Sequence, residues 1–269
     1  YMLIGKSMPF TSGTSGGTDS SPPIPADDVS DEFYIWDQSI AGKNISSSDI
    51  THAIPRRNWA NNTVYDMYED KISSSNLTAS GQSTIYQSTF YFRTSDNRVY
   101  KVLSNNNGTA YSGPEPTSES TAPFAQAGYI LKYMYTITQS ESSKFLTTDF
   151  MPVSTDSTVS AAATDGAIES LKVTGGSGYT DGTYYSPVAG DGANGIVKIV
   201  VAGGSIVKQG SAGTNMYTIG SGYTFANVDL TNVYTNVGLS TAGNIGSGSG
   251  GSVQPIISPN GGHGFDAVH

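Results

Sequence analysis

The segment from Tyr129 to Thr138 constrains the fold of this chain more than any other, because its side chains alternate with a period of two. Such alternation is typical of a β-strand with two different faces, and it does not fit the 3.6-residue period of a helix. One face is aromatic and apolar, and the other is mostly polar. The first face carries Tyr129, Leu131, Tyr133 and Tyr135, and the second carries Lys132, Thr136 and Thr138.

Two further patterns predict hairpins. Residues 84–94 and 98–103 are rich in aromatic and β-branched side chains, and Ser95-Asp96-Asn97 separates them as a three-residue turn. Residues 196–201 and 205–207 flank Ala202-Gly203-Gly204 in the same way. With 32 glycines, 17 tyrosines and only 13% charged residues, the composition favours short strands over amphipathic helices. We therefore expect a mainly β protein with little helix.

The amino-acid composition of the chain changes near residue 154 to one rich in Gly, Ser and Val, which predicts two domains. Residues 1–153 are expected to form a β-sandwich or barrel-like domain, and the small residues of 154–163 are expected to be a linker. From 164 to 269 a Gly-x-Gly-aromatic turn recurs at near-equal spacing, which predicts a Gly-rich domain of tandem β units. The three copies are Gly176–Tyr179, Gly220–Tyr223 and Gly262–Phe265.

Charge and cysteine content narrow the function classes. Thirteen Lys and Arg against 22 Asp and Glu give a net charge of -9, so the chain has no positive field to hold nucleic acid or anionic lipid. No apolar run approaches the roughly 18 residues that cross a bilayer. Cysteine is absent, which excludes disulfides and thiolate chemistry. We expect no nucleic-acid partner and no membrane partner.

The sequence gives little support for a catalytic site or a metal site. Asp66, Glu69 and Asp70 could supply paired carboxylates for a glycosidase, but their spacing fits a solvated acidic patch equally well. Residues 261–268 match the glycine- and aspartate-containing nonapeptide of calcium-binding β-rolls, yet Thr180 replaces the aspartate in the first copy of the turn. The chain is therefore expected to be no enzyme and to hold no cofactor or metal.

The densest group of anchoring side chains lies at residues 53–59, Ala-Ile-Pro-Arg-Arg-Asn-Trp. Pro55 fixes its own backbone and favours an extended segment, which would present Arg56 and Arg57 on opposite sides. Arginine and tryptophan often dominate protein interfaces, so these residues and Trp59 are interface candidates. An internal role, with Trp59 in the core and an arginine paired with a carboxylate, is equally open.

Five segments, in the same order, resemble the baseplate wedge subunit of contractile-tailed bacteriophages of the T-even type, the wedge protein that forms a homodimer. The stretch at 53–59 is the most specific of them. The others are Tyr1–Phe10, Arg98–Leu103, Gly128–Ile137 and Phe150–Val153. The region from about 164 does not align with the shorter T-even form and is interpreted as an inserted domain.

The resemblance implies a structural virion protein of the phage tail baseplate, assembled in the host bacterial cytoplasm. Its partners would be a second copy of itself and other wedge proteins, with Tyr133 and Tyr135 as further structural or interface candidates. The alternative is a receptor-binding tail or fibre module that recognises bacterial surface glycan, which the Gly-x-Gly-Tyr turns favour.

Overall fold

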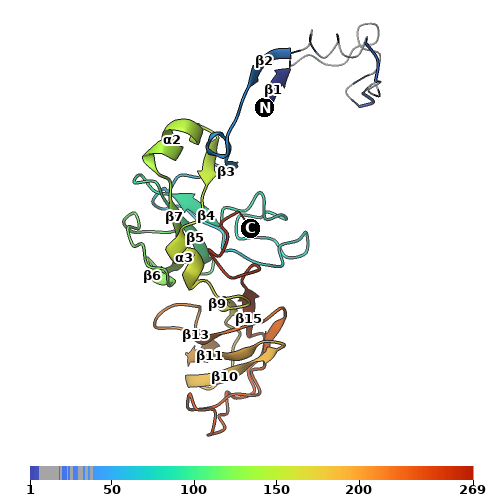
Figure 1. Cartoon of the computed structure of the whole chain (residues 1–269). Coiled ribbons are helices and arrows are strands. Elements are labelled where there is room, and N and C mark those ends of the chain that lie inside the picture. The colour runs from blue at the N-terminus through green and yellow to red at the C-terminus, as the bar shows by residue number, and fades with distance from the viewer. Residues whose placement is uncertain are drawn as a thin grey trace. The chain divides into compact units, whose positions relative to one another are not determined.

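The computed structural model describes residues 1–5 and 39–268, together with residues 18, 20–22, 24, 27–29, 33 and 36 between them. Its described part is mainly β with little helix, as the sequence predicts (Figure 1). The chain divides into two compact units, Tyr1–Thr51 and His52–His269. Residues 6–10 of the opening motif lie outside the described residues.

The first unit contains one two-stranded antiparallel hairpin. Strand β1 (Met2–Gly5) pairs with β2 (Ser39–Lys43), and the register sets Leu3 opposite Gly42. A 3-10 turn, η1 (Ser47–Asp49), follows, and the Asp49 carboxylate accepts a hydrogen bond from Ser46 N at 3.0 Å.

The second unit begins with β3 (His52–Pro55), which pairs with the distant strand β8 (Phe150–Val153). Beside them lies a four-stranded antiparallel sheet of order β4-β5-β7-β6. Its strands are β4 (Tyr91–Arg93), β5 (Arg98–Ser104), β6 (Phe124–Gln126) and β7 (Tyr129–Thr136). Helix α2 (Gln139–Phe145), capped by Thr138, joins β7 to β8.

The hairpin between β4 and β5 confirms the predicted turn at 95–97. Asn97 has a φ of 66°, the left-handed conformation that ends a three-residue hairpin loop and that asparagine tolerates better than most residues. The Thr94 N–H donates to the Arg98 carbonyl at 2.8 Å and closes the loop.

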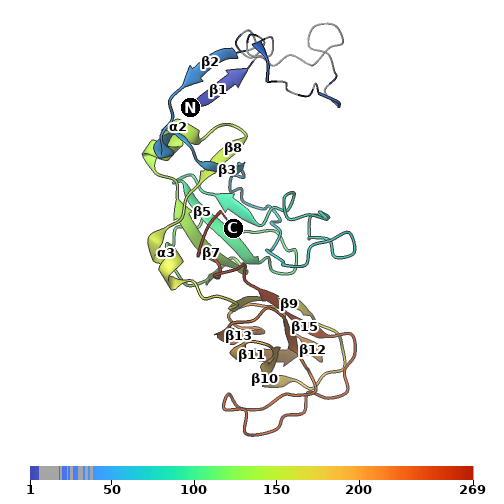
Figure 2. The same ribbon diagram turned by 45° about the vertical axis from the view of Figure 1, so that its right-hand side comes forward.

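The glycine-rich part holds two further sheets (Figure 2). Strand β9 (Ile168–Thr174) pairs with the late strand β15 (Ser252–Ile257). The other sheet has the order β12-β11-β10-β14, with β13 also paired to β11. Its strands are β10 (Gly182–Gly190), β11 (Ala193–Ala202), β12 (Ser205–Ile206), β13 (Asn215–Ser221) and β14 (Ala226–Val228).

The predicted linker at 154–163 contains helix α3 (Ser157–Ala162). The Asp156 carboxylate accepts hydrogen bonds from the backbone N–H groups of Thr158 and Val159, which satisfies the first turn. Val159 is buried in the same hydrophobic cluster as Tyr68 and Ile256. The segment is therefore packed against residues from both sides of the expected domain boundary.

All three predicted glycine turns adopt the backbone that only glycine takes readily. Both glycines of each copy have positive φ, from 61° at Gly220 to 99° at Gly262. Tyr179 and Tyr223 are buried in the aliphatic core of this part, as expected for a ring that covers a neighbouring strand. Phe265 differs, because its side chain is exposed.

Candidate functional site

Pro55 and Arg56 fasten the start of the second unit to the chain near β8. Pro55 ends β3 opposite Phe150, and the Arg56 N–H donates to the Asp149 carbonyl at 2.7 Å. The Arg56 guanidinium donates to the Thr147 carbonyl at 2.8 Å. This arginine thus binds a main-chain carbonyl, whereas the sequence suggested a carboxylate partner.

Arg57 contacts a different part of the chain from Arg56. Its guanidinium donates to the carbonyls of Tyr86 at 3.4 Å and Gln87 at 3.2 Å, and it lies 5.3 Å from the ring centroid of Tyr91. Its Nε is buried without a hydrogen-bond partner among the described residues. Arg57 therefore holds the 86–87 loop beside β4.

Trp59 is partly buried against the tyrosine-rich core. Its ring meets Tyr111 edge-on at a centroid distance of 6.2 Å, and its backbone N–H donates to the Arg93 carbonyl at 2.8 Å. The indole N–H is buried without a hydrogen-bond partner among the described residues. The stretch at 53–59 consequently serves internal contacts here. Its role in contacts between subunits stays a prediction.

Tyr133 and Tyr135, predicted on one face, belong to different hydrophobic clusters. The register shifts between Val99 and Tyr100, so that Tyr135 lies opposite Val99 while Tyr133 lies opposite Tyr100. One extra residue on β7 makes a β-bulge, which turns the strand's later side chains to the other face. Both tyrosines are buried, so neither presents its ring on the surface of the described chain.

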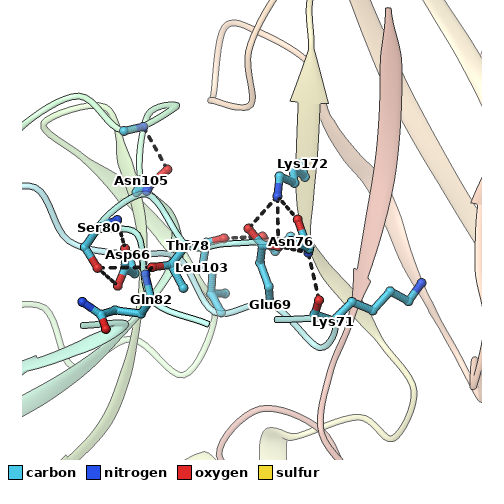
Figure 3. A network of polar contacts seen from close by, with 12 residues as sticks. Asp66, Glu69, Lys71, Asn76, Thr78, Ser80, Gln82, Leu103, Asn105 and Lys172 are labelled. Carbon is cyan, nitrogen blue, oxygen red and sulfur yellow. Dashed lines mark hydrogen bonds and ion pairs between the residues drawn. The ribbon is translucent and has the colours of Figure 1, made fainter. Parts of the chain in front are cut away.

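Two of the three acidic residues considered for catalysis, Asp66 and Glu69, are buried, whereas Asp70 is exposed, so the three do not form the solvated patch that the sequence suggested. Asp66 is 0% exposed, and its carboxylate accepts hydrogen bonds from Ser80 N at 2.8 Å, Ser80 Oγ at 2.7 Å and Thr89 N at 2.8 Å (Figure 3). Burial alone would raise the pKa of Asp66, but these hydrogen bonds bring it below its ordinary value. Asp66 therefore organises the loop that precedes β4.

Glu69 joins the same loop to the glycine-rich part. Its carboxylate lies 3.0 Å from the Lys172 Nζ on β9, and Asn76 donates to the same carboxylate at 3.0 Å (Figure 3). Lys172 also donates to the Asn76 side-chain oxygen at 2.9 Å. These contacts engage Glu69 in an ion pair between distant segments of the second unit.

Two lysines lie directly opposite each other on β5 and β7, on the face that the sequence suggested would be polar. Lys101 pairs in register with Lys132, and both are buried, at 7% and 2% exposed. Lys132 Nζ lies 3.0 Å from a Glu169 carboxylate oxygen on β9. Like charges at facing positions repel, and this single carboxylate neutralises only one of them.

Lys101 is held by aromatic rings instead. Its Nζ lies 3.6 Å from the ring centroid of Tyr68 and 5.7 Å from that of Phe90. Burial lowers the pKa of Lys101 to about 7, an effect that Lys132 adds to and Glu169 opposes. A lysine amine that titrates near pH 7 is a group that functional sites often contain.

His263, from the third glycine turn, reaches the same cluster. Its ring is buried, meets Tyr68 edge-on at 5.1 Å, and has no hydrogen-bond partner for either nitrogen among the described residues. Burial and the charges of Lys101 and Lys132 hold the pKa of His263 well below its usual range. The turn considered as a calcium site thus packs its histidine into the core. Across the described residues no three His, Asp or Glu side chains form a metal-binding group.

The sequence interpretation missed Lys101 and Lys132 as notable residues. A signal was present, because each lysine stands inside a strand that is otherwise aromatic or aliphatic, within residues 98–103 and 129–137. The alternation placed Lys132 on the mostly polar face, whereas in the structure it is buried and contacts Glu169 on β9. Long-range contacts of this kind leave no local pattern.

Comparison with protein-family models, with curated proteins and with solved structures finds no significant match for this chain. The described part contains no helix with the length and apolar character needed to cross a membrane. Functional inference therefore rests on the residues and their contacts.

Proposed function

We propose that this chain is a structural protein of a phage virion, a baseplate wedge subunit of a contractile tail that dimerises and bridges neighbouring wedge proteins. The observation that carries the proposal is that the segments with motif matches pair with one another as β-strands. Residues 53–55 pair with 150–153 through β3 and β8, and residues 98–104 pair with 129–136 through β5 and β7. Four segments that are far apart in the sequence thus build one framework.

The pairing matters because chance matches would not be expected to contact one another. Strand pairs are the units that specify a β fold, so a shared framework is what a shared family would preserve. In support of this, Arg56 adds a side-chain contact between the most specific motif and the segment just before β8.

The β1–β2 hairpin supports an assembly role, and we place the dimer contact there. Its apolar side chains are exposed, with Leu3 at 67% and Ile40 at 64%, and Met2 and Ile4 are also exposed. A two-stranded hairpin is at best marginally stable alone in water, and its outer edges can pair with another strand. A second copy of the same hairpin would cover this surface and satisfy those edges.

Light scattering on the full chain tests the dimer. We expect a mass of two chains for the unchanged protein and of one chain for the double variant Leu3→Lys and Ile40→Lys. Thr218→Lys, an exposed change on β13, is the matched control and should leave the dimer intact. A strict monomer for the unchanged chain would contradict the proposal.

A second candidate is glycan recognition by the glycine-rich part, favoured by exposed rings on that part. Tyr217 on β13 and Phe225 just before β14 are both more than half exposed, and Tyr217 stacks edge-on with Tyr185 at 5.6 Å. Exposed aromatic groups are typical of binding surfaces. Binding of purified bacterial surface glycan that Tyr217→Ala abolishes would favour this second function.

A further inference from the structure

A pocket of about 320 Å³ lies beside β4 and β5 in the second unit, and the proposed assembly role does not use it. Its volume falls at the lower end of the range for small-molecule sites, and its lining is mainly apolar and aromatic. The aromatic lining comes from Tyr68, Tyr86, Phe90, Tyr91 and Tyr135. Tyr86 is exposed, so the pocket opens to solvent beside it.

Lys101 is the cation of this lining. Tyr68 and Phe90, the two rings that bracket its Nζ, line the pocket as well. No hydrogen bond or ion pair joins the Nζ to any described residue, whereas the facing Lys132 has its carboxylate at 3.0 Å. The pocket is therefore walled mainly by apolar groups, and its one buried amine forms no ion pair with a described carboxylate.

A lysine at this position costs stability that an apolar side chain would not. Taking an ammonium group out of water without an anionic partner is unfavourable, and a ring face offsets only part of that cost. Asp266 also lines the pocket, but its carboxylate accepts hydrogen bonds from Thr155 Oγ1 at 3.3 Å and Val268 N at 2.9 Å. Among the described residues no ion pair reaches the Lys101 Nζ, which leaves a place for the anion of a ligand.

We propose that the pocket binds an apolar molecule carrying one carboxylate, whose hydrocarbon body contacts the aromatic lining and whose carboxylate pairs with Lys101 Nζ. The chemistry of the lining selects this class. An anion without an apolar body would leave the rings uncovered, and an apolar molecule without an anion would leave the amine unpaired.

The proposal predicts that the protein takes up a proton when the ligand binds. The charged and titratable groups around Lys101 are Lys132 and Glu169 on the adjoining strands, Tyr68 and Asp266 in the lining, and His263 in the third glycine turn. Burial lowers the pKa of Lys101 to about 7, so the free amine is mainly neutral at pH 8.5. A bound carboxylate favours the charged ammonium, and binding at that pH should take up close to one proton.

Titration calorimetry with octanoate tests the site, with octan-1-ol as the neutral ligand of equal chain length. Measurements at pH 8.5 in two buffers of different ionisation enthalpy report the protons taken up. We expect octanoate to bind at least tenfold more tightly than octanol and with uptake of nearly one proton.

Two variants complete the test. Lys101→Met should lose the preference for octanoate and the proton uptake while still binding octanol, since methionine keeps the apolar wall. Lys208→Met, an exposed lysine outside this pocket, should behave like the unchanged chain.

Three results on the unchanged chain would each overturn the proposal, even where a variant fails to fold. They are no octanoate binding at millimolar concentration, equal affinity for octanol, and octanoate binding without proton uptake. Retained octanoate preference in a folded Lys101→Met chain would overturn it as well.

Discussion

The tyrosine-rich region at 52–153 and the glycine-rich region at 164–258 are both β structures, but different side chains stabilise them. The core of the first is dominated by aromatic rings, and the core of the second by valine and isoleucine. Both regions carry long irregular segments, such as residues 105–123 in the first and 229–251 in the second.

In the first region, tyrosine hydroxyls hold the loops. Six buried tyrosines each pack a ring in the core and donate the hydroxyl to a main-chain carbonyl, four of them to loop backbone and two to the strands β3 and β8. The donors are Tyr65 to Ala60, Tyr91 to Pro55, Tyr100 to Ser118, Tyr111 to Pro114, Tyr129 to Thr109 and Tyr135 to Pro152.

In the second region, glycines make room for the rings. A Cβ at Gly248 would lie 2.4 Å from the Tyr179 ring, and one at Gly192 would lie 2.4 Å from the Tyr223 ring. The hydroxyls of these tyrosines accept hydrogen bonds from the backbone, at 3.0 Å from Gly251 N and 3.1 Å from Gly195 N. The comparison teaches that one residue type can anchor loops or close turns, depending on what surrounds its ring.

The largest expected effect comes from the ion pair between Lys132 and Glu169, the more deeply buried of two that join the two regions. Glu169→Gln would strand the buried Lys132 ammonium and should lower the free energy of unfolding by about 3 to 5 kcal/mol in urea denaturation. Replacing both residues, with Lys132→Met and Glu169→Leu, should recover most of that loss. A single change costing under about 1 kcal/mol would mean that the pair does not hold the regions together.

The glycine turns come next. Gly220→Ala requires a φ of 61° from alanine and sets its Cβ 2.6 Å from the Ala193 carbonyl oxygen, so we expect a loss of about 2 to 3 kcal/mol. Gly203→Ala is the control, because it has the same φ of 61° in open space and should cost about 1 kcal/mol. Thermal unfolding distinguishes them, and equal losses would remove the steric part of the argument.

The buried Lys101 should make the stability of the chain depend on pH above 7. The unfolded chain keeps the Lys101 proton up to its ordinary pKa of 10.5, whereas the folded chain releases it above about 7. Since the unfolded state binds more protons in this window, the free energy of unfolding should rise by about 1 kcal/mol per pH unit from 7 to 9.

His263 acts at lower pH with the same sign. Its folded pKa lies well below 6.5, so the unfolded state binds the extra proton and stability falls as the pH drops below 6.5.

Denaturation of the Lys101→Met variant across pH 7 to 9 tests whether Lys101 causes the rise in stability over that range. A slope unchanged by that substitution would assign the effect to another group.

The smallest expected effect tests whether a buried tyrosine hydroxyl anchors a loop of the first region. Tyr129→Phe removes a hydroxyl that donates to the Thr109 carbonyl at 2.6 Å and should cost about 1 kcal/mol. Tyr86→Phe, at an exposed ring, should change stability by under about 0.5 kcal/mol. Chemical denaturation of both, with hydrogen exchange at residues 105–112, measures the loop directly. Identical stabilities would show that the hydroxyl does not anchor the loop.

Local patterns in the sequence predicted much of this fold. The turn at 95–97 and the glycine turns depend on residues within a few positions, and the composition indicated the mainly β class. The register shift between Val99 and Tyr100 has no such local signal, so the pattern placed Tyr133 and Tyr135 together.

The candidate sites were harder to predict, because their partners lie far away in sequence. The carboxylate of Lys132 comes from β9, and the contacts of Arg56 and Arg57 are backbone carbonyls, which any residue could supply. Burial of Asp66 likewise depends on Ser80 and Thr89. Spacing along the chain carries no information on these contacts.

The most direct test of the proposed assembly role mixes the full chain with purified baseplate wedge proteins of a contractile-tailed phage and follows their sedimentation. We expect one complex of fixed stoichiometry that contains the chain as a dimer and is lost in the Leu3→Lys and Ile40→Lys variant. A chain that sediments alone in every mixture and instead binds bacterial surface glycan would contradict that role.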